Sequence, residues 1–317
     1  MIDLLFKKIE EYDTIIIHRH NRPDGDAIGS QLGLAETLKH KYPYKNIYCV
    51  GDEAAKYSFL GKMDNISDEV YENALVIIVD VAVKSMVSDD RYKLAKEVFV
   101  IDHHRNESDV TTNHIVDVTR VAAAEFIAAI LLDRGFEIPQ YAATCLYCAI
   151  ITDGGRFMYG SNLAETLRVA SELVKIGADY SFIYSNIYVE KLEDKQMKNY
   201  FSNRFEMTEN GVAYLKNTHE VFEKFPREFN DISRGMLSVM SGVEEIKIWL
   251  NFTYDISKDV IVGEFRSRDY SIVDIAKKWG GGGHSLACGA SIKTWEDVDL
   301  VIADFDSLLK EAKNNEG

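Results

Sequence analysis

Short runs rich in isoleucine and valine recur through the first half of the chain, and amphipathic stretches separate them. The runs do not alternate strictly between apolar and polar residues, which is typical of strands covered on both faces. This order predicts an α/β domain with a mainly parallel sheet flanked by helices. The predicted strands are Thr14–Arg19, Ile47–Val50, Leu75–Val81, Val98–Ile101 and His114–Val118. The predicted helices are Asp26–Tyr42, Val121–Arg134, Tyr141–Ile151 and Ala164–Ile176.

A second, smaller domain of α+β type is expected in the last third of the chain. The length of 317 residues exceeds the size at which one hydrophobic core usually stops growing. Asn210-Gly211 is a hairpin turn signal, and strand-like runs follow at Ile246–Phe252 and Val260–Phe265. The stretch before the hairpin is charged and helical, which fits an exposed helical linker. The expected boundaries are 1–187 for the first domain, 188–207 for the linker and 208–317 for the second domain.

The balance of charges excludes some classes of partner. Lys and Arg number 36 against 51 Asp and Glu, which gives a net charge of −15. An acidic surface repels long polyanions, so binding to duplex nucleic acid is disfavoured. No run reaches the length of about 18 apolar residues that a membrane span needs, and we expect no membrane contact. The first residues form an amphipathic pattern rather than a signal peptide, so we expect a cytoplasmic protein.

The cysteines favour a structural role. Four cysteines do not make a disulfide framework in a chain of this size. Cys145 and Cys148 have a metal-like spacing, but they lie in an apolar helical run and no second pair accompanies them. A buried helix is therefore favoured over a zinc or redox site.

Carboxylates and histidines follow the ends of three predicted strands and of one predicted helix. Because ligands bind at the carboxyl ends of the strands in open α/β sheets, the three strand-end groups should converge on one crevice. The helix-end group can be brought to the same edge. A single aspartate after a strand is usually a turn or capping residue, so the argument depends on the whole set. These residues are His20, Asp24, Asp26, Asp80, Asp102, His103, His104 and Asp153.

This set of side chains predicts a metal site. Several carboxylates in a partly desolvated crevice would repel one another, and a bound cation relieves that repulsion. Carboxylates and imidazoles without thiolates favour Mn²⁺ or Mg²⁺ before Zn²⁺. Asp24 and Asp26 can point to neighbouring ions, and a carboxylate such as Asp80 can bridge them. Two ions about 3.5–4 Å apart form the arrangement that activates water for in-line displacement at phosphorus.

The same residues, in the same order, resemble the motifs of the DHH phosphoesterase superfamily. The tract Gly280-Gly-Gly-Gly-His284 resembles the GGGH motif of the C-terminal domain associated with that superfamily. Together the motifs extend over nearly the whole chain. The two-domain form is similar to the bacterial group of oligoribonucleases and phosphatases of pAp (3′-phosphoadenosine 5′-phosphate). Relatives of that group cleave cyclic di-AMP and its linear product pApA.

The resemblance implies a ligand set for two Mn²⁺ ions, with Mg²⁺ or Co²⁺ as substitutes. Asp80 would bridge the ions, and Asp102 would lie behind the histidines and fix an imidazole orientation. His104 would contact the scissile phosphate or protonate the leaving ribose oxygen. The first ion would be held by His20, Asp24 and Asp80, and the second by Asp26, Asp80, His103 and Asp153.

The second domain would bind the far end of the substrate. Consecutive glycines let backbone N–H groups approach a phosphate, and an adjacent histidine adds a donor. A flexible loop is the alternative for a glycine tract alone. Arginines nearby favour the phosphate site, and Arg105 is a further candidate whose alternative is an ordinary surface arginine. The predicted contacts are Arg105, Arg266, Ser267, Arg268, Gly281, Gly282, Gly283 and His284.

The function implied is hydrolysis of very short nucleotides by attack of a hydroxide that bridges the two metals. Candidate substrates are pApA, cyclic di-AMP, RNA of two to five nucleotides and pAp. A non-catalytic sensor of a signalling dinucleotide and an inorganic pyrophosphatase of the family II type are the alternatives. The substrate rank and the physiological metal stay open, and a homodimer is compatible with the sequence.

Overall fold

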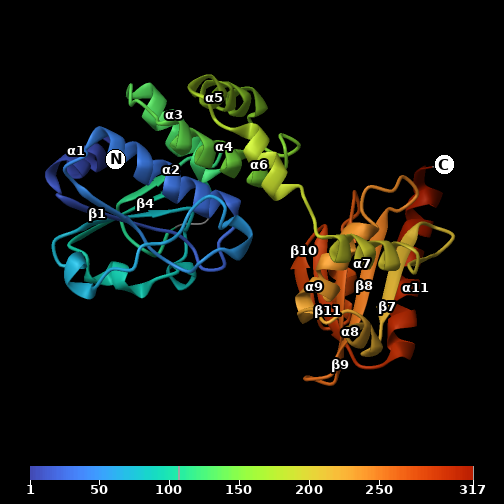
Figure 1. Cartoon of the computed structure of the whole chain (residues 1–317). Coiled ribbons are helices and arrows are strands. Elements are labelled where there is room, and N and C mark those ends of the chain that lie inside the picture. The colour runs from blue at the N-terminus through green and yellow to red at the C-terminus, as the bar shows by residue number, and fades with distance from the viewer. Residues whose placement is uncertain (106–107, 317) are drawn as a thin grey trace. The chain divides into compact units, whose positions relative to one another are not determined.

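The computed structural model describes residues 1–105 and 108–316. The chain divides into two compact units, Met1–Val189 and Glu190–Gly317, and each has its own sheet and hydrophobic core (Figure 1). Over the described ranges, no helix combines the length and the apolar character that crossing a membrane requires.

The first unit is built on a five-stranded parallel sheet in the order β2-β1-β3-β4-β5. The predicted α/β class is therefore confirmed. Because β2 and β3 lie on opposite sides of β1, the direction of winding reverses next to β1. The strands are β1 (Thr14–His18), β2 (Asn46–Cys49), β3 (Leu75–Val79), β4 (Glu97–Asp102) and β5 (His114–Val116).

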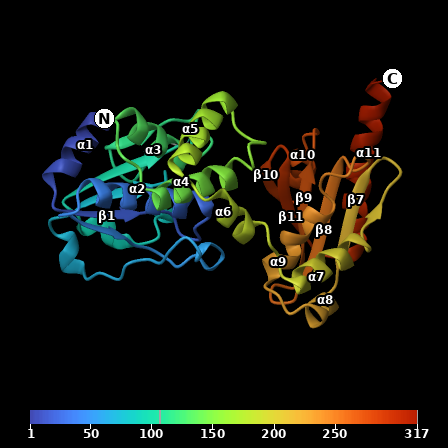
Figure 2. The same cartoon turned by 45° about the horizontal axis from the view of Figure 1, so that its top comes forward.

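Both faces of this sheet are covered, which explains why its strands are apolar throughout. Ile15 and Ile17 of β1 share one core with the long helices, whereas Ile16 belongs to a second core on the other face. Short 3₁₀ turns cover that second face and contribute Tyr71 and Tyr92 (Figures 1 and 2). The helices are α1 (Ile2–Glu11), α2 (Gly25–Lys41), α3 (Ala123–Asp133), α4 (Gln140–Asp153), α5 (Leu163–Ile176) and α6 (Tyr180–Ile187). The 3₁₀ turns of this unit are Ala55–Tyr57, Asp68–Tyr71, Lys84–Met86 and Asp90–Leu94.

Several strands end one or two residues earlier than the sequence predicts, and β3 ends at a strained residue. The predicted strand Leu75–Val81 stops at Val79, because Asp80 adopts a left-handed backbone conformation with φ 59°. A left-handed residue cannot continue a strand, and for a residue other than glycine it is strained. The strand therefore ends at a side chain that the sequence singles out.

The second unit is built on a six-stranded sheet in the order β10-β11-β9-β8-β7-β6. Only β7 and β8 pair in parallel among the strands that the structure describes here, and the hairpin predicted at Asn210-Gly211 joins β6 to β7. The strands are β6 (Glu206–Met207), β7 (Val212–Asn217), β8 (Ile248–Asp255), β9 (Val260–Ser267), β10 (Gly282–His284) and β11 (Ala287–Ile292).

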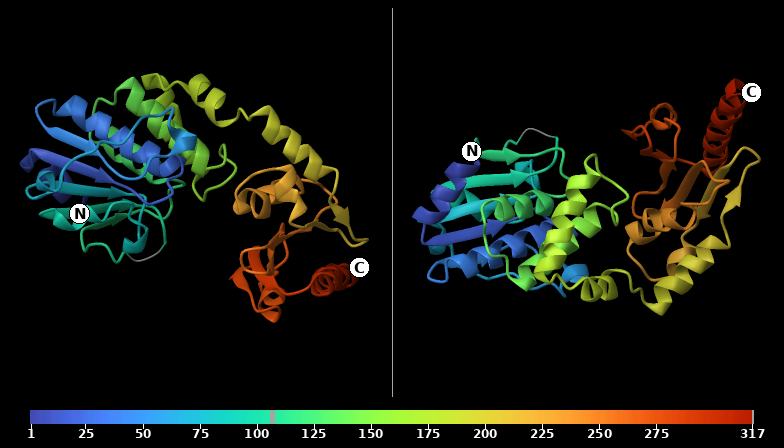
Figure 3. Two further views of the ribbon diagram at one scale, coloured as in Figure 1. Left: turned by 60° about the horizontal axis from the view of Figure 1, so that its bottom comes forward. Right: turned by 90° about the horizontal axis from the view of Figure 1, so that it is seen from above.

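Helices cover both faces of the second sheet. α11 (Trp295–Glu316) and α10 (Val273–Lys278) pack on one face, and α11 runs along the strands (Figure 3). The other face is covered by α7 (Leu192–Ser202), α8 (Glu220–Lys224), α9 (Phe229–Ser233) and the 3₁₀ turn Gly235–Val239. Helix α7 lies within the stretch predicted as an exposed linker, but Met197 and Phe201 on one side of it are buried. The charged residues of α7 lie on its other side. The overall composition of the helix therefore does not reveal its apolar face.

Candidate metal centre

The carboxyl ends of three neighbouring strands present the predicted side chains. His20 follows β1, Asp80 follows β3, and Asp102 ends β4, with His103 and His104 directly after it. These strands are adjacent in the order β1-β3-β4, so their carboxyl ends share one edge of the sheet. Their positions agree with the rule that ligands bind where the winding of an open sheet reverses.

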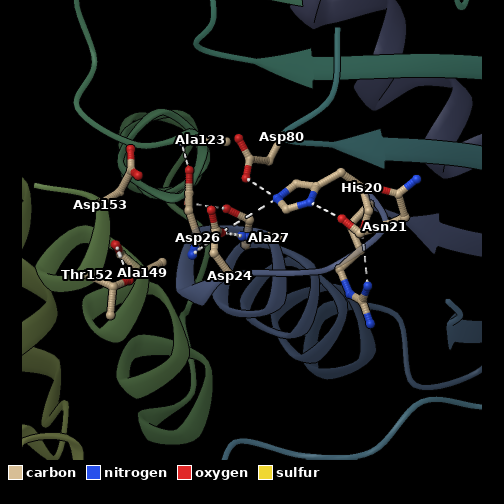
Figure 4. A network of polar contacts seen from close by, with 12 residues as sticks. His20, Asn21, Asp24, Asp26, Ala27, Asp80, Ala123, Ala149, Thr152 and Asp153 are labelled. Atoms are coloured by element: carbon tan, nitrogen blue, oxygen red, sulfur yellow. Dashed lines mark hydrogen bonds and ion pairs between the residues drawn. The ribbon is translucent and has the colours of Figure 1, made fainter. Parts of the chain in front are cut away.

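Two closely packed helices bring the remaining carboxylates to the same place. A Cβ added at Gly29 of α2 would lie 2.4 Å from the carbonyl oxygen of Cys145, and one added at Gly25 would lie 2.1 Å from the Thr152 hydroxyl. These contacts show that α2 and α4 run antiparallel, with the start of α2 beside the end of α4. Asp26 at the start of α2 therefore lies near Asp153 at the end of α4 (Figure 4).

Asp80 lies between two histidines. Its Oδ2 atom is 3.4 Å from Nε2 of His20, and its Oδ1 atom is 3.5 Å from Nε2 of His103. His20 Nε2 is also 3.6 Å from an oxygen of Asp24. His103 Nε2 is 3.7 Å from oxygens of both Asp26 and Asp153. The two oxygens of Asp80 thus face two separate groups of ligand atoms, and Figure 4 shows the side of Asp80 that faces His20.

Hydrogen bonds orient the imidazoles. Nδ1 of His20 lies 2.7 Å from the carbonyl oxygen of Asn21, and Nδ1 of His103 lies 3.2 Å from that of Arg120. A carbonyl oxygen can only accept, so each Nδ1 donates and each Nε2 faces the carboxylates. Nδ1 of His104 donates to Oδ1 of Asp102 over 2.7 Å, and the Nε2 of this exposed ring has no hydrogen bond to any residue that the structure describes.

The two aspartates of α2 are held by backbone N–H groups. Asp24 is the N-cap of α2 and accepts from the amides of Asp26 and Ala27. Asp26 is 1% exposed and accepts from the amides of Ala123 and Ala124, the first two residues of α3, over 2.6 and 3.0 Å. The positive end of the α3 dipole therefore stabilises the Asp26 carboxylate.

The electrostatics of the cluster fit a divalent cation. Burial raises the pKa of Asp153 to about 6, and burial with the nearby Asp80 carboxylate raises the pKa of Asp26 well above its usual value. Burial lowers the pKa of His20, but Asp24 and Asp80 more than offset this and raise it to about 10. These raised pKa values show that the cluster favours bound protons where carboxylates lie close together. A bound cation would take the place of those protons.

The oxygen and nitrogen atoms of the cluster also fit a divalent cation. Oδ1 of Asp80 is buried and has no hydrogen-bond partner within the described ranges. An orphaned carboxylate oxygen among imidazole nitrogens is costly unless a ligand engages it. The groups that could hold an ion are His20–Asp24–Asp80, Asp26–His103–Asp153 and Asp80–His103–His104. All of these ligands are oxygen or nitrogen atoms, which hard and borderline ions prefer.

The cluster opens into a pocket of about 180 Å³. One part of its lining is apolar and comes from the segment after β3: Val81, Ala82, Val83 and Met86. The sequence alone does not distinguish these residues, because a short apolar run after a strand resembles a longer strand. The pocket therefore offers a nonpolar surface beside the metal ligands.

The predicted substrate contacts lie in both units of the chain. Arg105 is exposed directly after His104. In the second unit, His284 on β10, Ala287 on β11 and Arg266 on β9 form one row across the sheet. The glycine tract is an edge strand rather than a loop, since Gly282 and Gly283 pair with β11. The Ser267 hydroxyl is buried and accepts from the amide of Tyr270, while Arg268 is exposed and donates to the Val243 carbonyl.

Further residues support the ligands without belonging to any of the motifs in the sequence. Ser30 donates to Oδ1 of Asp26 over 2.9 Å, and it lies one helical turn further along α2. Glu125 is fully buried and accepts from the amide of Val121. A glutamate at the third position of a helix often accepts from a backbone N–H at the start of that helix. The position of Glu125 in the predicted helix was therefore a signal for this hydrogen bond.

Comparison with known proteins identifies the two units. The first matches the DHH family, N-terminal domain, over residues 14–150, and the second matches the DHHA1 domain over residues 220–311. The chain is 36% identical to the bifunctional oligoribonuclease and PAP phosphatase NrnA of Bacillus subtilis, over 97% of this chain and 98% of that protein. It is 31% identical to the NrnA of Mycoplasma pneumoniae, over 93% of each.

A solved structure has the same fold. An exopolyphosphatase-related protein from Bacteroides fragilis superposes with a TM-score of 0.80 at 24% identity, over 98% of this chain and 97% of that one. The family models and the curated relatives thus agree with the motifs and with the arrangement of the sheets. The chain therefore belongs to the DHH superfamily of phosphoesterases, which hydrolyse phosphoester bonds, and it joins a DHH domain to a DHHA1 domain.

Proposed function

We propose that this protein is a manganese-dependent phosphodiesterase that hydrolyses short nucleotides to mononucleotides. The observation that supports this most strongly is Asp80, whose two oxygens face His20 and His103 at the mouth of the pocket. The relatives named oligoribonuclease and PAP phosphatase support the same substrate class. Candidate substrates are RNA of two to five nucleotides, pApA, cyclic di-AMP and pAp.

Two ions would be held by two overlapping sets of side chains. Asp80 would belong to both sets. When bound, divalent ions would lower the pKa of a water nucleophile and offset the charge of the phosphate. The first set is His20, Asp24 and Asp80, and the second is Asp26, Asp80, His103 and Asp153.

His104 would supply the proton for the leaving group. Its Nδ1 donates to Asp102, so Nε2 faces away from Asp102 and carries a proton when the imidazole is protonated. The hydrogen bond to Asp102 raises the pKa of His104. A protonated imidazole at this position can donate to the leaving ribose oxygen, or to the phosphate oxygen beside it.

The chain's charge favours short substrates. A long strand binds through many cationic contacts, and this chain has a net charge of −15. A few cations suffice for a substrate with one or two phosphates. The proposed contacts are Arg105 in the first unit and Arg266, Ser267, Arg268, Gly281, Gly282, Gly283 and His284 in the second.

A comparison of rates tests the proposal. The purified protein with excess Mn²⁺ should release mononucleotides from pApA and from RNA of two to five nucleotides, and it should be much slower on RNA of about 20 nucleotides. Cyclic di-AMP and pAp are assayed beside them, and pyrophosphate serves as the control substrate. Removal of the metal with EDTA should abolish turnover, and Mn²⁺ should restore it. Turnover of pyrophosphate with no release of AMP from pApA would contradict the proposal.

A further inference from the structure

The turn between β5 and α3, residues 117–122, contacts one proposed metal ligand and leads into the helix whose first amides hold another. The carbonyl oxygen of Arg120 accepts from Nδ1 of His103, which aims Nε2 of that ring at the carboxylates. Directly after the turn, the amides of Ala123 and Ala124 donate to the two oxygens of Asp26. The N-cap residue Ala122 has no side chain that could take up these amides, so they are available to Asp26. The position of this turn therefore decides the positions of both ligands.

A cluster of charges holds the turn from behind. The Arg120 guanidinium donates to Asp117 over 2.9 Å, to Glu165 over 2.9 Å and to Glu125 over 3.2 Å. Oε2 of Glu125 accepts from the amide of Val121 over 2.9 Å and from the Thr166 hydroxyl over 3.0 Å. The turn is thus tied to its own helix through Glu125 and to α5 through Glu165 and Thr166.

This arrangement is difficult to explain by stability alone. Glu125 is fully buried in α3, whose other buried residues are alanine, isoleucine, leucine and phenylalanine. The desolvation of a buried ion pair often exceeds its Coulombic gain, so apolar residues in place of both partners would commonly be neutral or stabilising. What the charged cluster provides is a precise position for the backbone of residues 120–124. Precise positions matter most where metal ligands are oriented from behind.

We infer that Arg120 and Glu125 are positioning residues for one side of the metal centre. They act on the group Asp26–His103–Asp153 through the backbone of the turn. The group His20–Asp24–Asp80 receives none of the hydrogen bonds of the turn, since Asn21 and the start of α2 orient its members. This inference rests on the proposed metal centre and predicts that the two ion sites depend on Glu125 to different degrees.

The test is a Mn²⁺ titration of the full chain, followed by electron paramagnetic resonance and calorimetry and resolved into two sites. Glu125→Gln keeps the size of the side chain but cannot accept all three hydrogen bonds. It should weaken one Mn²⁺ site by about 10- to 100-fold and leave the other within about threefold of the wild type. The matched control is Glu172→Gln on α5, which removes an exposed pair with Lys175 and should change neither site.

The outcomes separate this inference from the proposed function. Equal weakening of both sites in folded Glu125→Gln, or unchanged affinity at both, would overturn the positioning role. If Glu125→Gln does not fold, Thr166→Val is the second test. It removes only the hydrogen bond from Thr166 to Glu125 and should weaken the same Mn²⁺ site by a smaller factor. Unchanged affinity in folded Thr166→Val would also overturn the inference. A wild-type protein that binds no pair of Mn²⁺ ions would instead overturn the metal centre itself, and this inference with it.

Discussion

Asp80 unites three unusual properties in one residue. It has a left-handed backbone, its side chain is 3% exposed, and one of its oxygens is buried without a hydrogen-bond partner in the described chain. Strain of this kind persists only where the surroundings impose it, and it gathers at functional sites. The combination distinguishes Asp80 from an ordinary residue at a strand end.

Asp80→Ala should therefore remove both metal binding and turnover. Without the shared carboxylate neither group of ligands is complete, and a loss of several kcal/mol of charge stabilisation corresponds to about a 10³-fold lower rate. The measurements are Mn²⁺ stoichiometry and the rate on pApA. The control is Asp90→Ala, which removes an exposed pair with Lys93. Full turnover in Asp80→Ala would contradict the mechanism, and a wild type without turnover whose dinucleotide binding and signalling output persist in Asp80→Ala would favour a sensor.

The cysteine thiols should be inert in the folded protein. All four cysteines are buried, and burial raises the pKa of Cys49 and of Cys148 to about 12. At pH 8 these groups stay protonated, and a thiol is a poor nucleophile. A thiol reagent such as DTNB should react with no cysteine in the native state and with four in guanidinium chloride. Fast reaction of the Cys145–Cys148 pair in the native protein would revive the redox alternative.

At the scale of elements, the metal centre depends on the close contact of α2 with α4. Gly29→Ala tests this, because the added methyl group would meet the backbone of Cys145 and the side chain of Ala149. Alanine favours a helix, yet overpacking should lower the free energy of unfolding by about 1–3 kcal/mol. Denaturant unfolding measures the loss. In the control Gly235→Ala the new Cβ meets nothing nearer than 3.7 Å, so a similar loss there would show that packing is not the cause.

The elements also show how far the sequence alone could go. The strands and the long helices of the first unit could be predicted from apolar runs, and so could the position of ligands at strand ends. The left-handed backbone of Asp80 and the cluster of charges around Arg120 could not be predicted, because both depend on contacts between segments far apart in the chain. The pairing of the glycine tract as an edge strand was hidden for the same reason, since its partner β11 decides it.

At the scale of the molecule, the two units should separate under mild proteolysis. Val189 follows α6 and is 69% exposed, Leu192 begins α7 and is 72% exposed, and Lys191 lies between them. Brief digestion with trypsin should cut after Lys191 and give two fragments, each with its own core. Mass spectrometry of the first products checks this. Early cuts inside either sheet, with the bond after Lys191 intact, would contradict the division.

All the side chains that face the proposed ions belong to residues 1–189, whereas the row formed by Arg266 and His284 belongs to the other unit. On the proposed function, bond cleavage and choice of nucleotide would be encoded in separable stretches of the gene. A chimaera that keeps the first stretch and takes the second from a distant homologue should catalyse the same reaction with the substrate preference of that homologue.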